Sequence, residues 1–239
     1  MRILFIAFSL LSLTLITTNA QDLKTILDAH YKAAAQEKME KIETIITKGK
    51  NMYSMAGLES GFSMYQARPN KLRIEAEVQG TQVIQTFNGE TGWMYAPAMG
   101  ISEPKELSGQ ELETILNQGE FENPLWNYEE KGNTLELTGT SEDGSEDHLK
   151  LTTNKGDVLN FFINKESHLI TTIRSLQVMG ASEQEIEINL KDYKKLKGIP
   201  VSRYIVTKIG GEIVYTVTIE DLEYNKEIDP ALFEKPVLE

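Results

Sequence analysis

The segment KLRIEAEV, residues 71–78, alternates strictly between charged and apolar side chains. Alternation with a period of two places all the apolar side chains on one face of an extended strand. Segments 81–87 and 91–96 follow it across turn signals at Gln79-Gly80 and Asn88-Gly89. A strand with one dry face and one wet face is typical of an antiparallel sheet that is covered on one side only. This stretch therefore predicts a fold built around an antiparallel sheet.

Similar segments occupy most of the chain, from residue 43 to 67 and again from 134 to 224, with a hairpin turn at 154–156. Together they predict about ten or eleven strands, too many for a small flat sheet, so the sheet must curl or close. The predicted fold class is mainly β with helices (α+β).

The first helix is expected over residues 22–42, where Asp22 is placed to cap its start. Its apolar residues recur at helical spacing. They are Leu23, Ile26, Leu27, His30 and Tyr31.

Residues 100–128 interrupt the strand pattern with Pro104, Pro124 and two glycine breaks. Ser108 and Glu111 have the spacing of a capping box at the start of a short helix. Leu112, Ile115 and Leu116 form its apolar stripe. This stretch is interpreted as a helical insertion between strands.

The first twenty residues have the pattern of a signal peptide. Arg2 precedes an apolar run, and small residues lead to an expected cleavage after Ala20. The run is short for a membrane span, although a retained N-terminal anchor is the alternative. We therefore expect a single mature domain, residues 21–239, that is exported to the periplasm without a stable membrane anchor.

Composition narrows the classes of function. The formal net charge of -12 argues against binding to nucleic acid or to anionic membrane surfaces. The absence of cysteine excludes disulfides, thiolate metal sites and a cysteine nucleophile.

Motifs for catalysis are not found. The chain has no nucleophile elbow, dinucleotide-binding turn, P-loop or zinc-protease helix. His30, His148 and His168 are far apart in the sequence and are interpreted as surface or helix-face residues. The acidic segment 141–147 is expected to be a hairpin loop, because it lacks the ligand order of an EF-hand. We expect no enzyme activity, no cofactor and no metal; a hydrolase that uses scattered carboxylates is the alternative.

Two short blocks carry a family resemblance. Arg68-Pro69-Asn70 is followed by VIQTFNGETGWMYAP, with Gly89, Trp93, Tyr95 and Pro97 in matching places. Near the C-terminus, EIDPALFEKP places Phe233 and Pro236 in register. In this order the blocks resemble the periplasmic outer-membrane lipoprotein carriers (LolA-like) of the lipoprotein-sorting superfamily. The chain departs from the family at 72–74, where an aromatic pair is common, and it is longer than typical members.

The resemblance implies an unclosed, strongly curved antiparallel β-barrel with a helical lid. It implies a monomeric carrier that takes acylated lipoprotein or lipid cargo from an inner-membrane donor complex to an outer-membrane acceptor. It further implies that Arg68 latches the lid by donating to backbone carbonyls of the 100–128 insertion. The expected hydrophobic lining is Leu72, Ile74, Val83, Phe87, Trp93, Tyr95, Met64, Met94, Met99, Leu112, Ile115 and Leu116.

Three alternatives remain open from the sequence. The lining residues can instead fill an ordinary core. The ligand can be a different hydrophobic molecule, such as a free lipid or a glycolipid. The protein can also be an envelope interaction protein without a transport role.

Overall fold

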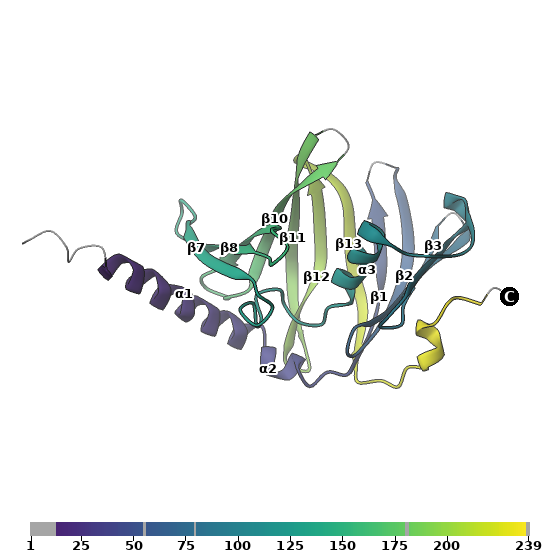
Figure 1. Cartoon of the computed structure of the whole chain (residues 1–239), viewed down its shortest axis with the longest axis horizontal. Coiled ribbons are helices and arrows are strands. Elements are labelled where there is room, and N and C mark those ends of the chain that lie inside the picture. The colour runs from purple at the N-terminus through teal and green to yellow at the C-terminus, as the bar shows by residue number, and fades with distance from the viewer. Residues whose placement is uncertain (1–12, 55, 79, 180–181, 238–239) are drawn as a thin grey trace, which may run out of the picture.

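The computed structural model describes residues 13–54, 56–78, 80–179 and 182–237. Thirteen antiparallel strands form one sheet in the order β6-β5-β4-β3-β2-β1-β13-β12-β11-β10-β9-β8-β7 (Figure 1). The first and last strands of this order are not paired with each other, so the sheet is curved but not closed. The predicted open, curved antiparallel sheet is confirmed.

The strands on one side of β13 are β1 (Thr44–Tyr53), β2 (Leu58–Ala67), β3 (Lys71–Val78), β4 (Thr81–Phe87), β5 (Gly92–Ala96) and β6 (Ile101–Glu106). Those on the other side are β7 (Thr134–Thr140), β8 (Glu146–Thr152), β9 (Val158–Asn164), β10 (Ile170–Met179), β11 (Ser182–Leu196) and β12 (Ile199–Ile209), and β13 itself spans Glu212–Tyr224. The helices are α1 (Leu13–Ala33), α2 (Gln36–Met39) and α3 (Gly109–Gly119), with 3-10 turns η1 (Pro97–Met99) and η2 (Pro230–Phe233).

The expected strand count of ten or eleven is too low. Residues 101–106, which the sequence assigns to the helical insertion, form the edge strand β6. Pro104 is compatible with this position because an edge strand has one row of N–H groups that needs no partner. The helix of the insertion is confirmed as α3, with Ser108 at its N-cap, but the Ser108 side chain makes no capping hydrogen bond.

The expected first helix, residues 22–42, is instead two helices. α1 ends at Ala33, and Ala35 adopts a left-handed conformation with φ of 55° before α2 begins. At its other end α1 begins at Leu13, within the expected signal segment, of which residues 1–12 lie outside the described part of the chain.

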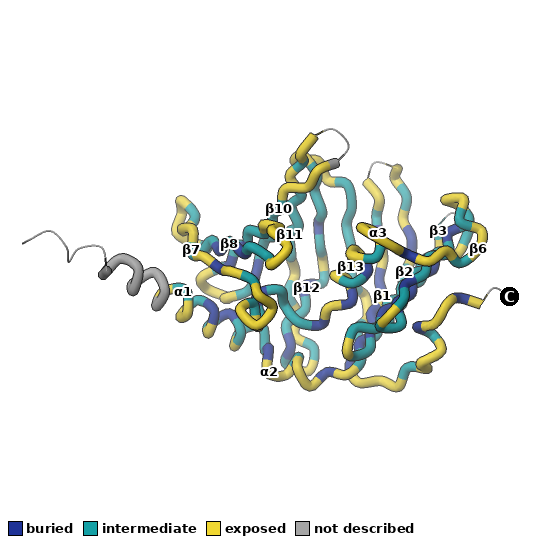
Figure 2. The backbone as a smooth tube through the Cα atoms, viewed as in Figure 1, coloured by how far each residue is buried: buried dark blue, intermediate teal, exposed yellow. Residues whose placement is uncertain are grey.

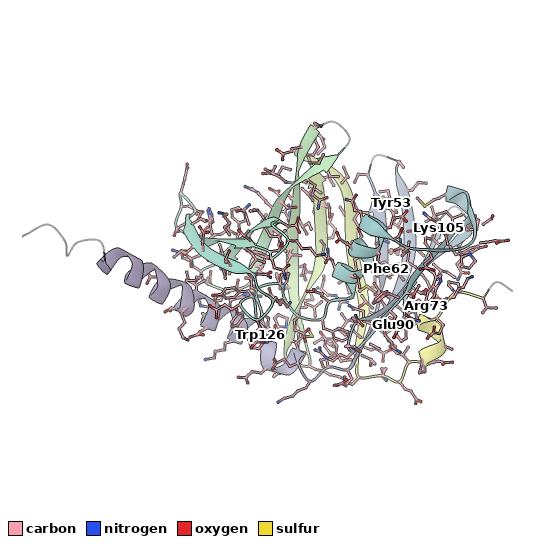
Figure 3. The ribbon with its side chains drawn as sticks, viewed as in Figure 1. Tyr53, Phe62, Arg73, Glu90, Lys105 and Trp126 are labelled. Carbon is pink, nitrogen blue, oxygen red and sulfur yellow. The ribbon has the colours of Figure 1, made fainter. Side chains whose placement is uncertain are left out.

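Both helical segments cover the concave face of the sheet. α1 packs against β7–β10 through a cluster containing Leu27, Leu149 and Phe161, whereas α3 packs over β3 and β4 through Leu72, Phe87 and Ile115. The C-terminal turn η2 lies against the convex face, where the Nη1 of Arg73 donates to the carbonyl of Leu232 at 2.9 Å (Figures 1 and 3).

Candidate functional site: an apolar cavity beneath a tethered strap

The middle of the concave face, between α1 and α3, is apolar and only half-buried (Figure 2). The strand register sets which side chains share this face, because directly opposed residues in a ladder point the same way. Ile173 opposes both Ile188 and the buried Phe161, which lies under α1. The half-buried apolar residues on this face are Phe62, Ile173, Ile186, Ile188, Leu190, Ile205, Val217 and Ile219.

Residues 121–126, here called the strap, cross this face after α3. Phe121 packs into the cluster formed by Ile45, Ile199 and Tyr224. Leu125 is fully buried in the cluster beneath α1. The strap therefore joins the two packed regions of the concave face and passes over the space between them.

Arg68 ties one end of the strap to the rest of the protein. Its Nε donates to the carbonyl of Ile42 at 2.7 Å and its Nη2 to the carbonyl of Met39 at 3.2 Å. The same guanidinium pairs with the Glu122 carboxylate and lies over the Phe121 ring, 4.6 Å from its centroid.

The partners of Arg68 differ from those expected. The carbonyl acceptors are Met39, the last residue of α2, and Ile42, between α2 and β1, and neither belongs to the 100–128 insertion. The insertion contributes the carboxylate of Glu122 and the ring of Phe121 instead. The carbonyl partners were implied by the family resemblance, whereas the charged partner depends on the tertiary packing of this chain.

His30 holds the middle of the strap. Its Nδ1 donates to the carbonyl of His168 at 2.7 Å, and because a carbonyl only accepts, the neutral ring leaves Nε2 as an acceptor. That nitrogen receives a hydrogen bond from the side-chain amide of Asn123. The Asn123 Oδ1 accepts from the Leu125 N–H at 2.9 Å, which fixes the orientation of the amide. Burial of the ring lowers the pKa of His30.

Aromatic contacts secure the far end of the strap. The Tyr31 hydroxyl donates to the Leu125 carbonyl at 2.6 Å, and its ring meets Trp126 edge-on with 4.8 Å between centroids. Trp126 in turn donates to the Glu40 carboxylate at 3.1 Å, close to α2 (Figure 3). Burial raises the pKa of Tyr31 to about 12, so its hydroxyl stays protonated and able to donate at neutral pH.

An apolar cavity of about 230 Å³ lies beneath the strap. Its walls come from α1, α2, the strap and strands β10–β12. The lining residues are His30, Ala34, Gln36, Met39, Phe121, Asn123, Pro124, Leu169, Ile170, Ile173, Leu190, Tyr193, Ile199 and Pro200. This cavity, together with the half-buried apolar face beside it, is the candidate binding site.

Most of the hydrophobic residues predicted from sequence lie elsewhere on the concave face. Leu72, Phe87 and Ile115 are buried in a small core under α3. Met64, Ile74, Met94, Leu112 and Leu116 pack around that core. None of these residues lines the cavity. Val83 opposes Ala76 on the same face and is half-buried, and Met99 is 69% exposed in η1.

Trp93 and Tyr95 face the other way. Gly92 opposes Phe87, so Trp93 opposes Thr86 and Tyr95 opposes Ile84. Because Phe87 points to the concave face, these two aromatic residues point to the convex face, and their expected place beside Phe87 is wrong. The turn at residues 88–91 sets this register, and counting alternation through that turn would have revealed it.

The residues that do form the cavity were missed because they are distant in sequence. Gln36, Asn123 and Tyr193 come from α2, the strap and β11. No local motif connects them. His30 was expected in the apolar stripe of the first helix and is buried there, only 1% exposed, but its hydrogen bond to the strap was not expected. His148 is half-buried and His168 is exposed, and the described residues contain no group of side chains suited to a metal ion.

Solved structures of other proteins have a similar architecture. A DUF1329 family protein from Desulfovibrio piger superposes with a TM-score of 0.59 at 15% identity, covering 87% of this chain and 96% of that one. A LolA superfamily protein from Nitrosomonas europaea gives 0.57 at 12% identity, over 81% and 90% of the two chains. The fold is LolA-like.

A third structure, a domain from Vibrio parahaemolyticus assigned to outer membrane lipoprotein sorting, gives a TM-score of 0.53 at 12% identity. It covers 82% of this chain and 92% of that domain. No protein-family model and no curated protein sequence matches the chain. Within the described residues, no helix has both the length and the apolar character needed to cross a membrane.

Proposed function

We propose that this protein is a periplasmic carrier that shields the acyl chains of a lipoprotein, or of a related lipid, while they pass between membranes. The cavity beneath the strap is the observation that carries the proposal. The LolA-like fold supports it, since one protein of this fold is assigned to lipoprotein sorting. Binding and release, not catalysis, are the proposed chemistry.

The energetic need for a carrier follows from the cargo. Exposing an acyl chain to water costs about 0.8 kcal/mol for each methylene. A chain can therefore cross an aqueous space only when most of its methylenes are covered. The apolar face between α1 and α3 provides this cover in a protein whose charged surface keeps it dispersed in water.

The size of the cavity indicates how loading occurs. At about 230 Å³ it is smaller than the roughly 300–1,000 Å³ of ordinary small-molecule sites. In the closed form it accommodates only part of an acyl chain. Release of the strap would join the cavity to the neighbouring half-buried face and lengthen the site. Arg68 and His30 hold the strap in the closed form, and they are the proposed latch.

The proposal extends to the partners. A donor complex in the inner membrane would load the carrier, and an acceptor at the outer membrane would unload it. The segment up to and including Ala20 would be removed on export.

The first test is to identify what the protein carries. The mature chain, residues 21–239, is purified from cells, extracted with organic solvent and analysed by mass spectrometry. Recovery of acylated peptides or diacyl lipid supports the carrier. Recovery of a glycolipid alone favours a different hydrophobic ligand. A protein that emerges empty and binds no fluorescent fatty-acid ester contradicts the proposal and favours an envelope interaction protein.

A matched pair of variants locates the binding site. Ile173→Trp introduces a large ring into the cavity, whereas Leu176→Trp makes a similar change on the same strand at a position that is 65% exposed. Ile173→Trp should abolish binding of a fluorescent fatty-acid ester and Leu176→Trp should preserve it, while circular dichroism confirms that both variants fold. Equal binding by the two variants would place the ligand elsewhere.

A further inference from the structure

The lining of the cavity contains one polar group that the protein itself leaves unpaired. Gln36 is 3% exposed, and its Nε2 has no hydrogen-bond partner among the described residues. The other polar side chains of the lining are paired. His30 bonds with His168 and Asn123, and the Tyr193 hydroxyl donates to the Ile170 carbonyl at 2.8 Å.

A buried donor without a partner is costly, because burial removes its hydrogen bonds to water and nothing replaces them. Such groups are rare in folded proteins and mark places where a ligand or a buried water completes the hydrogen bonding. Gln36 begins α2, the element that closes the cavity next to the strap. Sites for mostly apolar ligands use a small number of polar groups in an apolar wall to orient the ligand. The unpaired amide of Gln36 has this placement.

The charge of the lining restricts the ligand further. The lining contains no lysine, arginine, aspartate or glutamate. Burial lowers the pKa of His30, which keeps its ring neutral at neutral pH. An ionised carboxylate placed here would have no cation to balance it and would bear a large desolvation cost. The cavity therefore suits a neutral acceptor oxygen.

We propose that Gln36 binds the carbonyl oxygen of an ester- or amide-linked acyl chain, so that the cavity selects acylated ligands over free fatty acids and plain hydrocarbons. This inference rests on the proposed function and names the chemical class of its ligand. The amide donates to the carbonyl, while the methylenes next to it contact Ile173, Leu190 and Ile199.

The test compares three probes of the same chain length: methyl decanoate, decanoic acid at neutral pH, and decane. Each displaces a fluorescent apolar dye from the mature protein. We expect the ester to bind about tenfold more tightly than decane, as one hydrogen bond to an otherwise unpaired donor implies, and more tightly than the acid. In Gln36→Met the advantage of the ester over decane should disappear. Gln85→Met, a matched change outside the cavity lining, should behave as the wild type.

Infrared spectroscopy gives a readout that a purely structural role of Gln36 would not move. With methyl decanoate labelled with carbon-13 at the carbonyl, the C=O stretch should lie at the lower frequency of a hydrogen-bonded ester. It should return to the free value in Gln36→Met. The unliganded Gln36→Met protein should be as stable as the wild type or more stable, because it loses a buried unpaired donor.

The outcomes separate this inference from the carrier proposal. If the wild type and Gln36→Met bind all three probes equally, the role of Gln36 is overturned and the carrier stands. If no probe binds to either protein, the carrier proposal fails. A free carbonyl frequency in the wild-type complex also overturns the assignment.

Discussion

Arg68, which directly follows β2, forms an ion pair with Glu122, which lies in the strap that follows α3 in the chain. Each of these side chains is 23% exposed, so the pair is partly shielded from solvent. Through Met39 and Ile42 the same guanidinium also holds the segment that links α2 to β1. One side chain thus connects three segments that must separate if the strap is to lift from the cavity.

Replacing the arginine should unfasten the strap without unfolding the sheet. Arg68→Leu removes several charge-assisted hydrogen bonds, each with a net contribution of about 1.5–3 kcal/mol. We expect faster amide hydrogen exchange in residues 121–126, an unchanged circular dichroism spectrum and blocked or trapped cargo in a reconstituted transfer assay. Arg203→Leu, which removes an arginine bonded to the Glu220 carbonyl, is the control. Normal transfer by Arg68→Leu would count against the latch.

Acidification should loosen the strap through His30. Its lowered pKa means that the unfolded chain takes up a proton near pH 6.5 while the folded protein resists it. Stability should therefore be complete above pH 6.5 and fall as the pH drops toward the lowered value. A proton on Nε2 would also face the amide donor of Asn123. The titratable groups near His30 include His168, Tyr31 and, in the same cavity lining, Tyr193.

Urea unfolding at pH 7.5 and 5.5 measures this effect. His30→Gln should remove most of the loss of stability between pH 7.5 and pH 5.5. His168→Asn should retain it, because the backbone carbonyl that accepts from His30 is preserved. A wild-type protein equally stable at both pH values would contradict the role assigned to His30.

Glu187 should stabilise the convex face in a defined pH range. Hydrogen bonds from Lys208 and Asn189, together with Arg174, lower its pKa to about 2. The contribution of Glu187 to stability is present above the ordinary pKa of glutamate, and it is lost as the pH falls from that pKa toward 2. Because Arg174 and Lys208 are 42% and 34% exposed, we expect Glu187→Gln to cost only about 1 kcal/mol at pH 7. Thermal unfolding at pH 7 and pH 3 should show the difference between variant and wild type shrinking in acid.

The join between β1 and β13 has no room for a side chain at Gly49. A Cβ there would lie 2.2 Å from the carbonyl oxygen of Thr218 and 2.8 Å from the Phe62 ring. Gly49→Ala should therefore destabilise the protein by about 3 kcal/mol, because the obstructing oxygen belongs to the backbone. Gly61→Ala, in the neighbouring strand with open space around its Cβ position, should change stability little. Chemical denaturation of both variants measures the contrast.

Local sequence patterns predicted the strands and α3 well, because alternation and turn chemistry act over a few residues. The hairpin turns at Asn88 and at residues 154–156 are where the sequence places them. The edge strand β6 was missed because Pro104 argues against a strand unless its edge position is known. The same patterns identified which residues of α3 are apolar but not that they fill a core.

The sequence by itself determined an antiparallel sheet with apolar residues on one face, since these features follow from short-range periodicity. That the sheet is open was implied by the family resemblance. Only the tertiary structure decided where that face stays unfilled. His30 and Asn123 are 93 residues apart, and Arg68 and Glu122 are 54 apart. Contacts over such separations depend on how the whole sheet curves and on which helix covers which strands. That curvature places the cavity beneath the strap and not beneath α3.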